Sequence, residues 1–199
     1  MIMKLNLTIG QKVKALIVLV LFFLLLLATN KIDNNHFKVV KKSMSTIYED
    51  RLVAQDYIYK LSQNLQSKGL SLAINDKVNY SLNDSINYLV QVYEETKFTS
   101  REAKCFDSFK VNLDQLHNLE QEFKRLASSE VKQKIYQQHN VLNMQLDKLA
   151  EIQLKEGKRQ TKISNRSIST SDLISNMEIA ALIIIGLLIN ALIFIKPNS

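Results

Sequence analysis

The stretch FKVVKKSMSTIYEDRLVAQDYIYKLSQNL, residues 37–65, decides the fold class. Its inward positions recur at alternating spacings of three and four, the heptad repeat of a helix that packs against other helices. The repeat comprises Phe37, Val40, Met44, Ile47, Arg51, Ala54, Ile58, Leu61 and Leu65. One member of this seam, Arg51, is charged. We therefore expect a long packed helix that reaches about Leu72 and ends in a turn at residues 74–76.

Three more helical patterns follow this helix. Thr99, three residues before Glu102, has the spacing of a capping box, in which each side chain bonds to the backbone N–H of the other. Ser128 and Ser129 interrupt the next pattern and can cap a final helix. The apolar positions are Val78, Leu82, Ile86, Leu89 and Tyr93 in the second helix, Phe106, Phe109, Leu113, Leu116, Phe123 and Leu126 in the third, and Val131, Ile135, Leu142, Leu149 and Ile152 in the fourth.

The composition agrees with long helices joined by short turns. The 199 residues include only four glycines and one proline, the residues on which strands and tight turns rely. The single cysteine, Cys105, excludes an intramolecular disulfide. We predict an all-α protein, an up-down-up-down four-helix bundle flanked by two transmembrane helices.

The two apolar ends of the chain predict membrane anchoring. Residues 15–30 carry no charge, and residues 179–195 are interrupted only by Gly186 and Asn190. A cleavable signal peptide is the alternative for the first stretch, but no small-x-small site follows it. The basic residues Lys4, Lys12 and Lys14 precede it, so the positive-inside rule places both termini in the cytoplasm.

This topology divides the chain into five parts. They are a basic cytoplasmic N-terminus (1–14), a first span (15–30), an extracytoplasmic bundle (31–178), a second span (179–195) and a cytoplasmic tail (196–199). The expected location is the bacterial inner membrane, with the bundle in the periplasm. Residues 155–176 are too polar to hold a helix against one neighbour by apolar burial, which favours a homodimer whose stem has four helices.

Catalytic, metal and nucleic-acid chemistry find little support. Residues 31–178 contain 22 of the 26 basic residues and all 19 acidic residues, which gives this part a net charge of +3. Such a mixed surface lacks the dense basic patch that nucleic-acid binding requires. His36, His117 and His139 lie on different predicted helices without metal-ligand spacing, and no phosphate loop or hydrolase motif occurs. We expect no enzyme, metal or cofactor.

Two pairs of residues are candidate contact sites. Arg51 occupies a core position, where an unpaired charge is costly. It either extends its charged end to water or pairs with Glu94, Glu102 or Glu156. Alternatively, it forms with Arg159 a site for an anionic ligand such as a carboxylate. In the second span, Gly186 and Asn190 share a helix face that permits close approach and a hydrogen bond to a partner helix.

With these elements in place, the chain resembles the four-helix-bundle sensor domain of methyl-accepting chemotaxis proteins. The resemblance rests on the span–bundle–span layout over residues 5–195 and on three short stretches. These are Tyr48-Glu49-Asp50-Arg51-Leu52-Val53, the turn from Lys97 through Thr99 to Glu102 and Phe106, and the run Leu149, Ile152, Gln153, Leu154, Lys155, Glu156, Gly157.

The resemblance implies a sensory module that binds a small molecule or a periplasmic protein. Chemoreceptors continue beyond the second span into a cytoplasmic signalling part, whereas only residues 196–199 follow here. A signal would therefore have to pass laterally to a membrane partner that carries the output. The alternatives are a dimeric helical adaptor or spacer of the cell envelope without a ligand, and a remnant of a truncated chemoreceptor.

Overall fold

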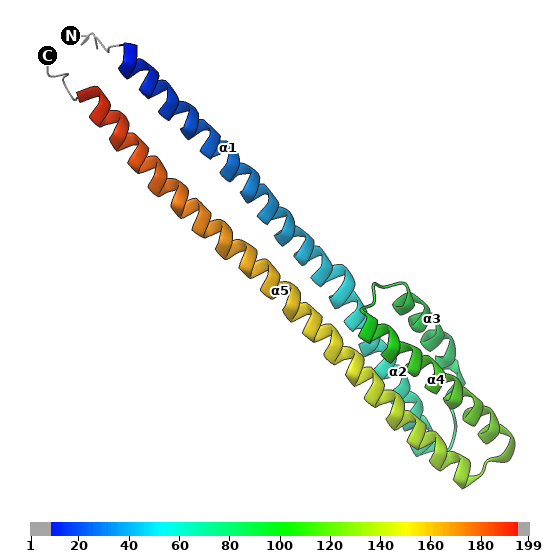
Figure 1. Ribbon diagram of the computed structural model, residues 1–199. Coiled ribbons are helices and arrows are strands. Elements are labelled where there is room, and N and C mark those ends of the chain that lie inside the picture. The colour runs from blue at the N-terminus through cyan, green and yellow to red at the C-terminus, as the bar shows by residue number, and fades with distance from the viewer. Residues whose placement is uncertain (1–8, 195–199) are drawn as a thin grey trace. The chain divides into compact units, whose positions relative to one another are not determined.

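The computed structural model describes residues 9–194, and every regular element within them is a helix (Figure 1). The elements are α1 (Ile9–Ser45), a π-helix η1 (Thr46–Leu52), α2 (Val53–Asn75), a short 3₁₀ helix η2 (Tyr80–Leu82), α3 (Asn83–Glu94), α4 (Ser100–Leu126) and α5 (Ser129–Phe194). The expected all-α class is confirmed. The chain divides into a terminal unit (Met1–Ser43 with Lys162–Ser199) and a bundle unit (Met44–Thr161).

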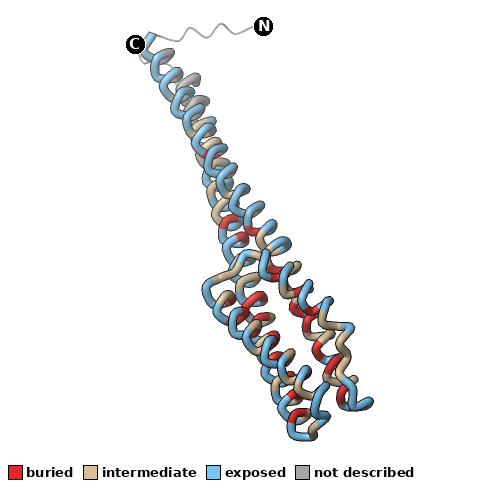
Figure 2. The backbone as a smooth tube through the Cα atoms, turned by 90° about the vertical axis from the view of Figure 1, so that its right-hand side faces the viewer, coloured by how far each residue is buried: buried red, intermediate tan, exposed pale blue. Residues whose placement is uncertain are grey.

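The bundle unit is a four-helix bundle with one hydrophobic core. The core draws residues from all four long helices of the unit, and Figure 2 shows them as the red inward faces. Its buried members include Ile58, Leu61, Leu65 and Leu72 of α2, Ile86, Leu89 and Tyr93 of α3, Phe106, Phe109, Leu113 and Leu116 of α4, and Ile135, Leu142, Leu146 and Leu149 of α5. Most of the core predicted from the heptad pattern is confirmed for this unit, but Leu126 is 64% exposed, and Val78, Leu82 and Phe123 are only partly buried.

The connections make neighbouring helices antiparallel. Asp76, directly after α2, forms an ion pair with Lys132 at the start of α5, so these two helix ends lie together. The α3–α4 turn lies at the other end of the bundle, because its Lys97 carbonyl accepts a hydrogen bond from Arg51 at 3.1 Å. This is the up-down-up-down arrangement that the short turns predict.

The helix ends follow local chemistry. Thr99 and Glu102 form the complete capping box at the start of α4, with both bonds at 3.2 Å. Ser128 accepts the N–H of Glu130 at 3.2 Å before α5. Asp76 and Ala127 end α2 and α4 in the left-handed conformation, with φ of 51° and 46°. The break predicted at Ser128–Ser129 is thus confirmed, whereas α2 extends beyond the predicted end near Leu72 to Asn75, and of the predicted turn residues only Asp76 lies outside the helix.

In the terminal unit, polar side chains of the α1 segment up to Ser43 contact polar side chains of the α5 segment from Lys162. His36 and Ser167 lie 3.3 Å apart, and Ser171 donates to Asp33 at 2.6 Å. Ser43 is 3% exposed, whereas Phe37 is 69% exposed. The predicted inward position of Phe37 is therefore wrong, and the same holds for Met44, at 60% exposed at the edge of the bundle unit.

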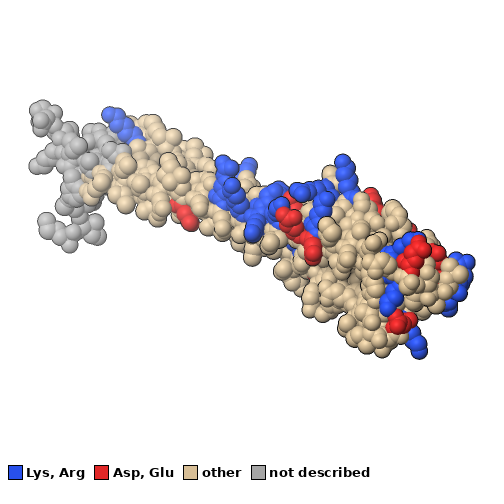
Figure 3. All heavy atoms as spheres, turned by 90° about the horizontal axis from the view of Figure 1, so that it is seen from below, with Lys and Arg blue, Asp and Glu red and all other residues tan. Residues whose placement is uncertain are grey.

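Two helices are long and apolar enough to cross a membrane, as judged by length and composition: Val13–Asn75 and Ser129–Leu187. On the face shown in Figure 3, the surface next to the grey ends carries few charged side chains, and the rest of this face carries separate clusters of basic and acidic side chains. Residues 1–8 of the predicted basic start, including Lys4, and the whole predicted tail, including Lys196, lie outside the described residues, whereas residues 9–14 belong to α1.

Candidate functional site

The guanidinium group of Arg51 is buried, and both of its Nη atoms donate hydrogen bonds to the protein. Arg51 is the sixth of the seven residues of the π-helix η1, and 8% of its surface is exposed. Its Nη1 donates to Glu102 Oε2 at 3.1 Å and to Gln153 Oε1 at 2.9 Å, while its Nη2 donates to the Lys97 carbonyl. Arg51 thereby connects helix one, the continuous helix formed by α1, η1 and α2, to α4, to α5 and to the α3–α4 turn. Of the three predicted acidic partners, Glu102 is the one that it contacts.

Glu102 is fully buried, so its carboxylate has no water to bond with and accepts hydrogen bonds from several protein groups instead. Its Oε2 accepts the Thr99 N–H as well as Arg51, and its Oε1 accepts the Tyr93 hydroxyl at 2.8 Å and the Gln153 amide. Burial, followed by the charge of Glu102, raises the pKa of the Tyr93 phenol, so Tyr93 stays a neutral donor. The buried carboxylate is therefore compensated by one cation and by neutral donors.

An open groove of about 750 Å³ borders this network on the bundle surface. The side of helix one contributes Ile47, Arg51, Leu52 and Gln55, and α5 contributes seven residues from Ala150 to Thr161. Its walls are mostly apolar, and Leu52 and Leu154 are more than half exposed. The Nε of Arg51 is buried and has no hydrogen-bond acceptor within the described residues. The groove thus offers an apolar surface, and one of its lining residues, Arg51, has an Nε–H that donates no hydrogen bond within the described residues.

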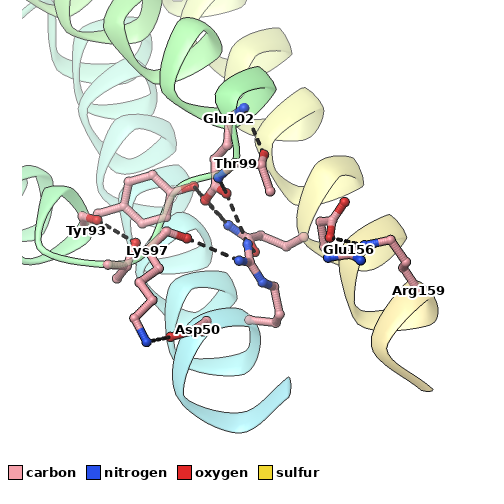
Figure 4. A network of polar contacts seen from close by, with 10 residues as sticks. Asp50, Tyr93, Lys97, Thr99, Glu102, Glu156 and Arg159 are labelled. Carbon is pink, nitrogen blue, oxygen red and sulfur yellow. Dashed lines mark hydrogen bonds and ion pairs between the residues drawn. The ribbon is translucent and has the colours of Figure 1, made fainter. Parts of the chain in front are cut away.

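Arg159, the second residue of the predicted anion site, lies outside this network. Its Nε donates to Glu156 at 2.7 Å, and Figure 4 shows the two side chains paired with each other on α5. Arg51 lines the groove, whereas Arg159 is not among its lining residues. Gly186 and Asn190 of the terminal unit are both exposed, and a Cβ added to Gly186 would meet nothing within 4 Å.

A second buried ion pair lies in the bundle, between α2 and α4. Lys68 Nζ and Glu120 Oε2 are 2.8 Å apart, with both side chains 1% exposed, and Lys68 also donates to Asn83. His139 of α5 is 6% exposed. Its Nδ1, together with His117 Nε2 and Glu120 Oε1, has no hydrogen-bond partner in the described part of the chain.

The electrostatics of this interior follow from burial. Burial and then the charge of Lys68 lower the pKa of His139 to about 4, and the same two causes lower the pKa of His117. Burial raises the pKa of Glu120, and the bond to Lys68 opposes that rise. Both histidines are accordingly held neutral beside a buried cation.

The sequence interpretation did not anticipate Lys68, Glu120 or Gln153. A signal exists for Lys68 and for Glu120. Lys68 continues the spacing of Leu61, Leu65 and Leu72 on the buried face of α2. Glu120 likewise follows Leu113 and Leu116 on the buried face of α4. Polar residues at such positions interrupt an apolar pattern, and only the register between helices shows which of them face each other.

Comparison with known proteins identifies a family to which the chain is similar. A family model described as a four-helix-bundle sensory module for signal transduction matches residues 6–168, most of the chain. No curated protein and no solved structure matches the sequence.

Proposed function

Because the chain belongs to the family of four-helix-bundle sensory modules of chemotaxis proteins, we propose that it is a membrane-anchored sensor. Its bundle would bind a small molecule or a periplasmic protein and transmit the signal through a partner. The observation that carries the proposal is the apolar groove beside Arg51, bounded by helix one and α5. These are the two helices whose apolar segments are candidates to cross a membrane.

Membrane anchoring is supported by the exposure of the apolar segments. Leu16 is 60% exposed and Ile183 is 59% exposed, and so are many neighbours of both. A core helix of a soluble protein buries such side chains, and water-exposed apolar patches of this extent are rare. An alkaline phosphatase fusion after Gly69 or Ser129 should be active and one after Ser199 inactive. The opposite pattern would reverse the topology and exclude a periplasmic bundle.

The groove beside Arg51 is the candidate ligand site. The Nη atoms of Arg51 are occupied by Glu102, Gln153 and Lys97, so an anion would have to compete for Arg51 or use the rim residue Lys158. The predicted role of Arg51 and Arg159 in binding a carboxylate remains part of the proposal. Small carboxylates and small neutral apolar compounds are therefore the two classes to test.

Gly157 offers a direct test, because it lines the groove and a Cβ there meets nothing within 4 Å. Full-length protein in lipid nanodiscs would be screened by thermal shift against both classes. Gly157→Phe should abolish the shift caused by a binding compound, because the ring fills the groove. Gly157→Ala is the matched control, which gains helix propensity of about 1 kcal/mol and leaves the groove open.

The Gly157 variants also separate the sensor from its alternative. A compound that stabilises the wild-type chain and Gly157→Phe equally does not bind in the groove. If no compound from either class stabilises the wild-type chain, the helical adaptor without a ligand becomes the better explanation.

A homodimer and a lateral membrane partner complete the proposal. The exposure of Phe37 and Met44 on α1 supports a dimer contact along this helix. Single cysteines between Asn34 and Ser45 in a Cys105→Ser background should crosslink to the second copy with helical periodicity. Gly186 and Asn190 are the proposed contact for the lateral partner, and crosslinking beside them in membranes, followed by mass spectrometry, would identify it. Aperiodic crosslinks along α1 would exclude the dimer, and recovery of the dimer alone would exclude the partner.

A further inference from the structure

A buried histidine lies next to the second ion pair of the bundle. His139 of α5 is 6% exposed, and a Cβ added to Gly69 of α2 would lie 3.9 Å from its Cγ, so the imidazole packs directly against α2. Lys68, the residue before Gly69, is 1% exposed. Its Nζ contacts Glu120 Oε2 of α4 at 2.8 Å and donates to Asn83 at the start of α3. Polar groups from all four helices of the bundle therefore meet here.

The charges of this cluster balance only while its histidines are neutral. Lys68 and Glu120 supply one positive and one negative charge, and His117 lies one turn before Glu120 on α4. Neither His139 Nδ1 nor His117 Nε2 has a hydrogen-bond partner within the described residues, so neither atom has an acceptor that would stabilise a charged ring. A proton on His139 would place a second cation beside Lys68 in the bundle interior, which is costly.

The proton affinity of His139 therefore depends on whether the bundle is closed. Burial, followed by the charge of Lys68, lowers the pKa of His139 to about 4, whereas a histidine in water has a pKa of about 6.5. An opening that exposes the ring restores the ordinary pKa, so the open form binds a proton that the closed form does not bind. Between pH 7 and pH 5, this difference alone shifts the equilibrium toward the open form by about twentyfold.

The other titratable groups of the cluster act in both directions. Burial and the charge of Lys68 lower the pKa of His117, partly opposed by the exposed Asp114, so His117 also favours opening in acid. Burial raises the pKa of Glu120, so the closed form binds a proton on Glu120 more readily and acidification favours the closed form. The difference between the wild-type chain and a variant without His139 isolates the contribution of His139.

The cluster lies in one half of the bundle, next to the contact between Asp76 and Lys132. This Lys68 half comprises residues 61–75 of α2, 113–126 of α4 and 129–142 of α5. The Arg51 half comprises residues 51–58, 102–109 and 146–154, and these stretches contain no histidine. Histidine is the side chain that ordinarily changes its charge between pH 5 and pH 8, so mild acid acts on the Lys68 half. Openings of part of a fold are normal fluctuations of native proteins.

We propose that His139 is a proton-operated switch that opens the Lys68 half of the bundle in mild acid. At pH 7 the neutral ring packs against α2, and the pair of Lys68 and Glu120 connects α2 to α4. At pH 5 protonation of His139 favours a form in which α5 has separated from α2 in this half and the ring is in water. In a periplasmic bundle, the acidity of the surroundings would thereby become a signal for the sensor; this last step alone rests on the proposed function.

Hydrogen exchange of the full-length protein in lipid nanodiscs, measured by mass spectrometry at pH 7 and pH 5, tests the switch. Exchange rates corrected for the intrinsic effect of pH give the opening equilibrium of each half. From pH 7 to pH 5, opening of the Lys68 half should increase about twentyfold more in the wild-type chain than in His139→Gln. His36→Gln is the matched control, because it removes a histidine from the terminal unit, and it should retain the wild-type response. His139→Phe, which is also always neutral, replaces His139→Gln if that variant does not fold.

Equal responses of the Lys68 half in the wild-type chain and in the folded His139 variant would overturn the proposal. So would an equal increase in the Arg51 half, because it would show that the whole bundle opens. A response that is lost in His139→Gln, retained in His36→Gln and confined to the Lys68 half would support the switch. The measurement requires neither a ligand nor a particular topology. Its failure therefore leaves the proposed sensor intact, and a failed ligand screen leaves the switch intact.

Discussion

Replacing Lys68 with methionine should remove a large part of the stability of the bundle. The side chains of Lys68 and Glu120 are each 1% exposed, and Lys68 is the only side-chain partner that Glu120 has among the described residues. Removing one member of a buried pair leaves an uncompensated charge and costs about 3–5 kcal/mol. For a chain of this length, about 1 kcal/mol corresponds to 2–4 °C. We expect the Tm of Lys68→Met to fall by about 10 °C.

Two comparisons make this expectation specific to the buried pair. Lys60→Met changes the same residue type on the same helix, but the ion pair of Lys60 with Asp56 is 52% and 50% exposed. Exposed pairs contribute about 0–1 kcal/mol, so its Tm should move by 3 °C at most. The double variant Lys68→Met/Glu120→Leu should recover most of the lost stability, because apolar packing replaces a buried pair at little net cost.

The pH dependence of Lys68→Met supplies a third comparison. Burial already raises the pKa of Glu120, and without Lys68 the main opposing influence is gone. A carboxyl whose folded pKa lies above its unfolded pKa stabilises the fold below the unfolded pKa and loses that contribution as pH rises through the folded pKa. The Tm deficit should therefore be smaller at pH 5 than at pH 8.

The assay is thermal unfolding of the full-length protein in detergent, followed by circular dichroism at 222 nm. A Tm of Lys68→Met within 2 °C of that of Lys60→Met would refute the reasoning. A double variant no more stable than Lys68→Met would also refute it.

Three further predictions use the same unfolding measurement. The pKa of His139 in the folded protein is lowered to about 4, so the free energy of unfolding should fall by up to about 3 kcal/mol as the pH decreases from 6.5 to 4. His139→Gln should lose less stability over this pH range. Equal losses in the two proteins would contradict this prediction. Ala127→Gly should raise stability by about 1 kcal/mol, because Ala127 has φ of 46°, whereas Ala150→Gly inside α5 should lower it by a similar amount; effects of the same sign would be inconsistent with strain at Ala127. Thr99→Ala should cost about 1 kcal/mol through loss of the α4 cap, and an unchanged Tm would show that the cap is dispensable.

The helices and most of the core could be predicted from the sequence because both follow from periodicity and capping chemistry. The Thr99–Glu102 spacing located the start of α4, and the spacing of Ile58, Leu61 and Leu65 identified the buried face of α2. Arg51 was recognised as a charge in the core, and Glu102 was one of its three predicted partners.

The parts that could not be predicted depend on register. In the terminal unit the inward residues of α1 are Ser43 and His36, and Phe37 and Met44 are exposed, so their predicted burial was wrong. The hydrogen bonds of Arg51 in η1 go to Glu102 and Gln153, which lie 51 and 102 positions further along the chain, so a local pattern does not reveal them. Likewise, the pairing of Lys68 with Glu120 requires α2 and α4 at a particular height, which neither helix specifies alone.

The double role of Glu102 has a consequence for how the bundle opens. Its carboxylate caps the first turn of α4 and also binds Arg51 of helix one, so one side chain joins a local element to a distant one. Fraying of a helix end is normally the cheapest fluctuation in a protein, with amide hydrogens that exchange within the native state. At the start of α4 fraying also releases Arg51 into an apolar interior. The amides of Ala103 to Phe106 should therefore exchange only when the bundle separates, as part of the same cooperative unit as η1.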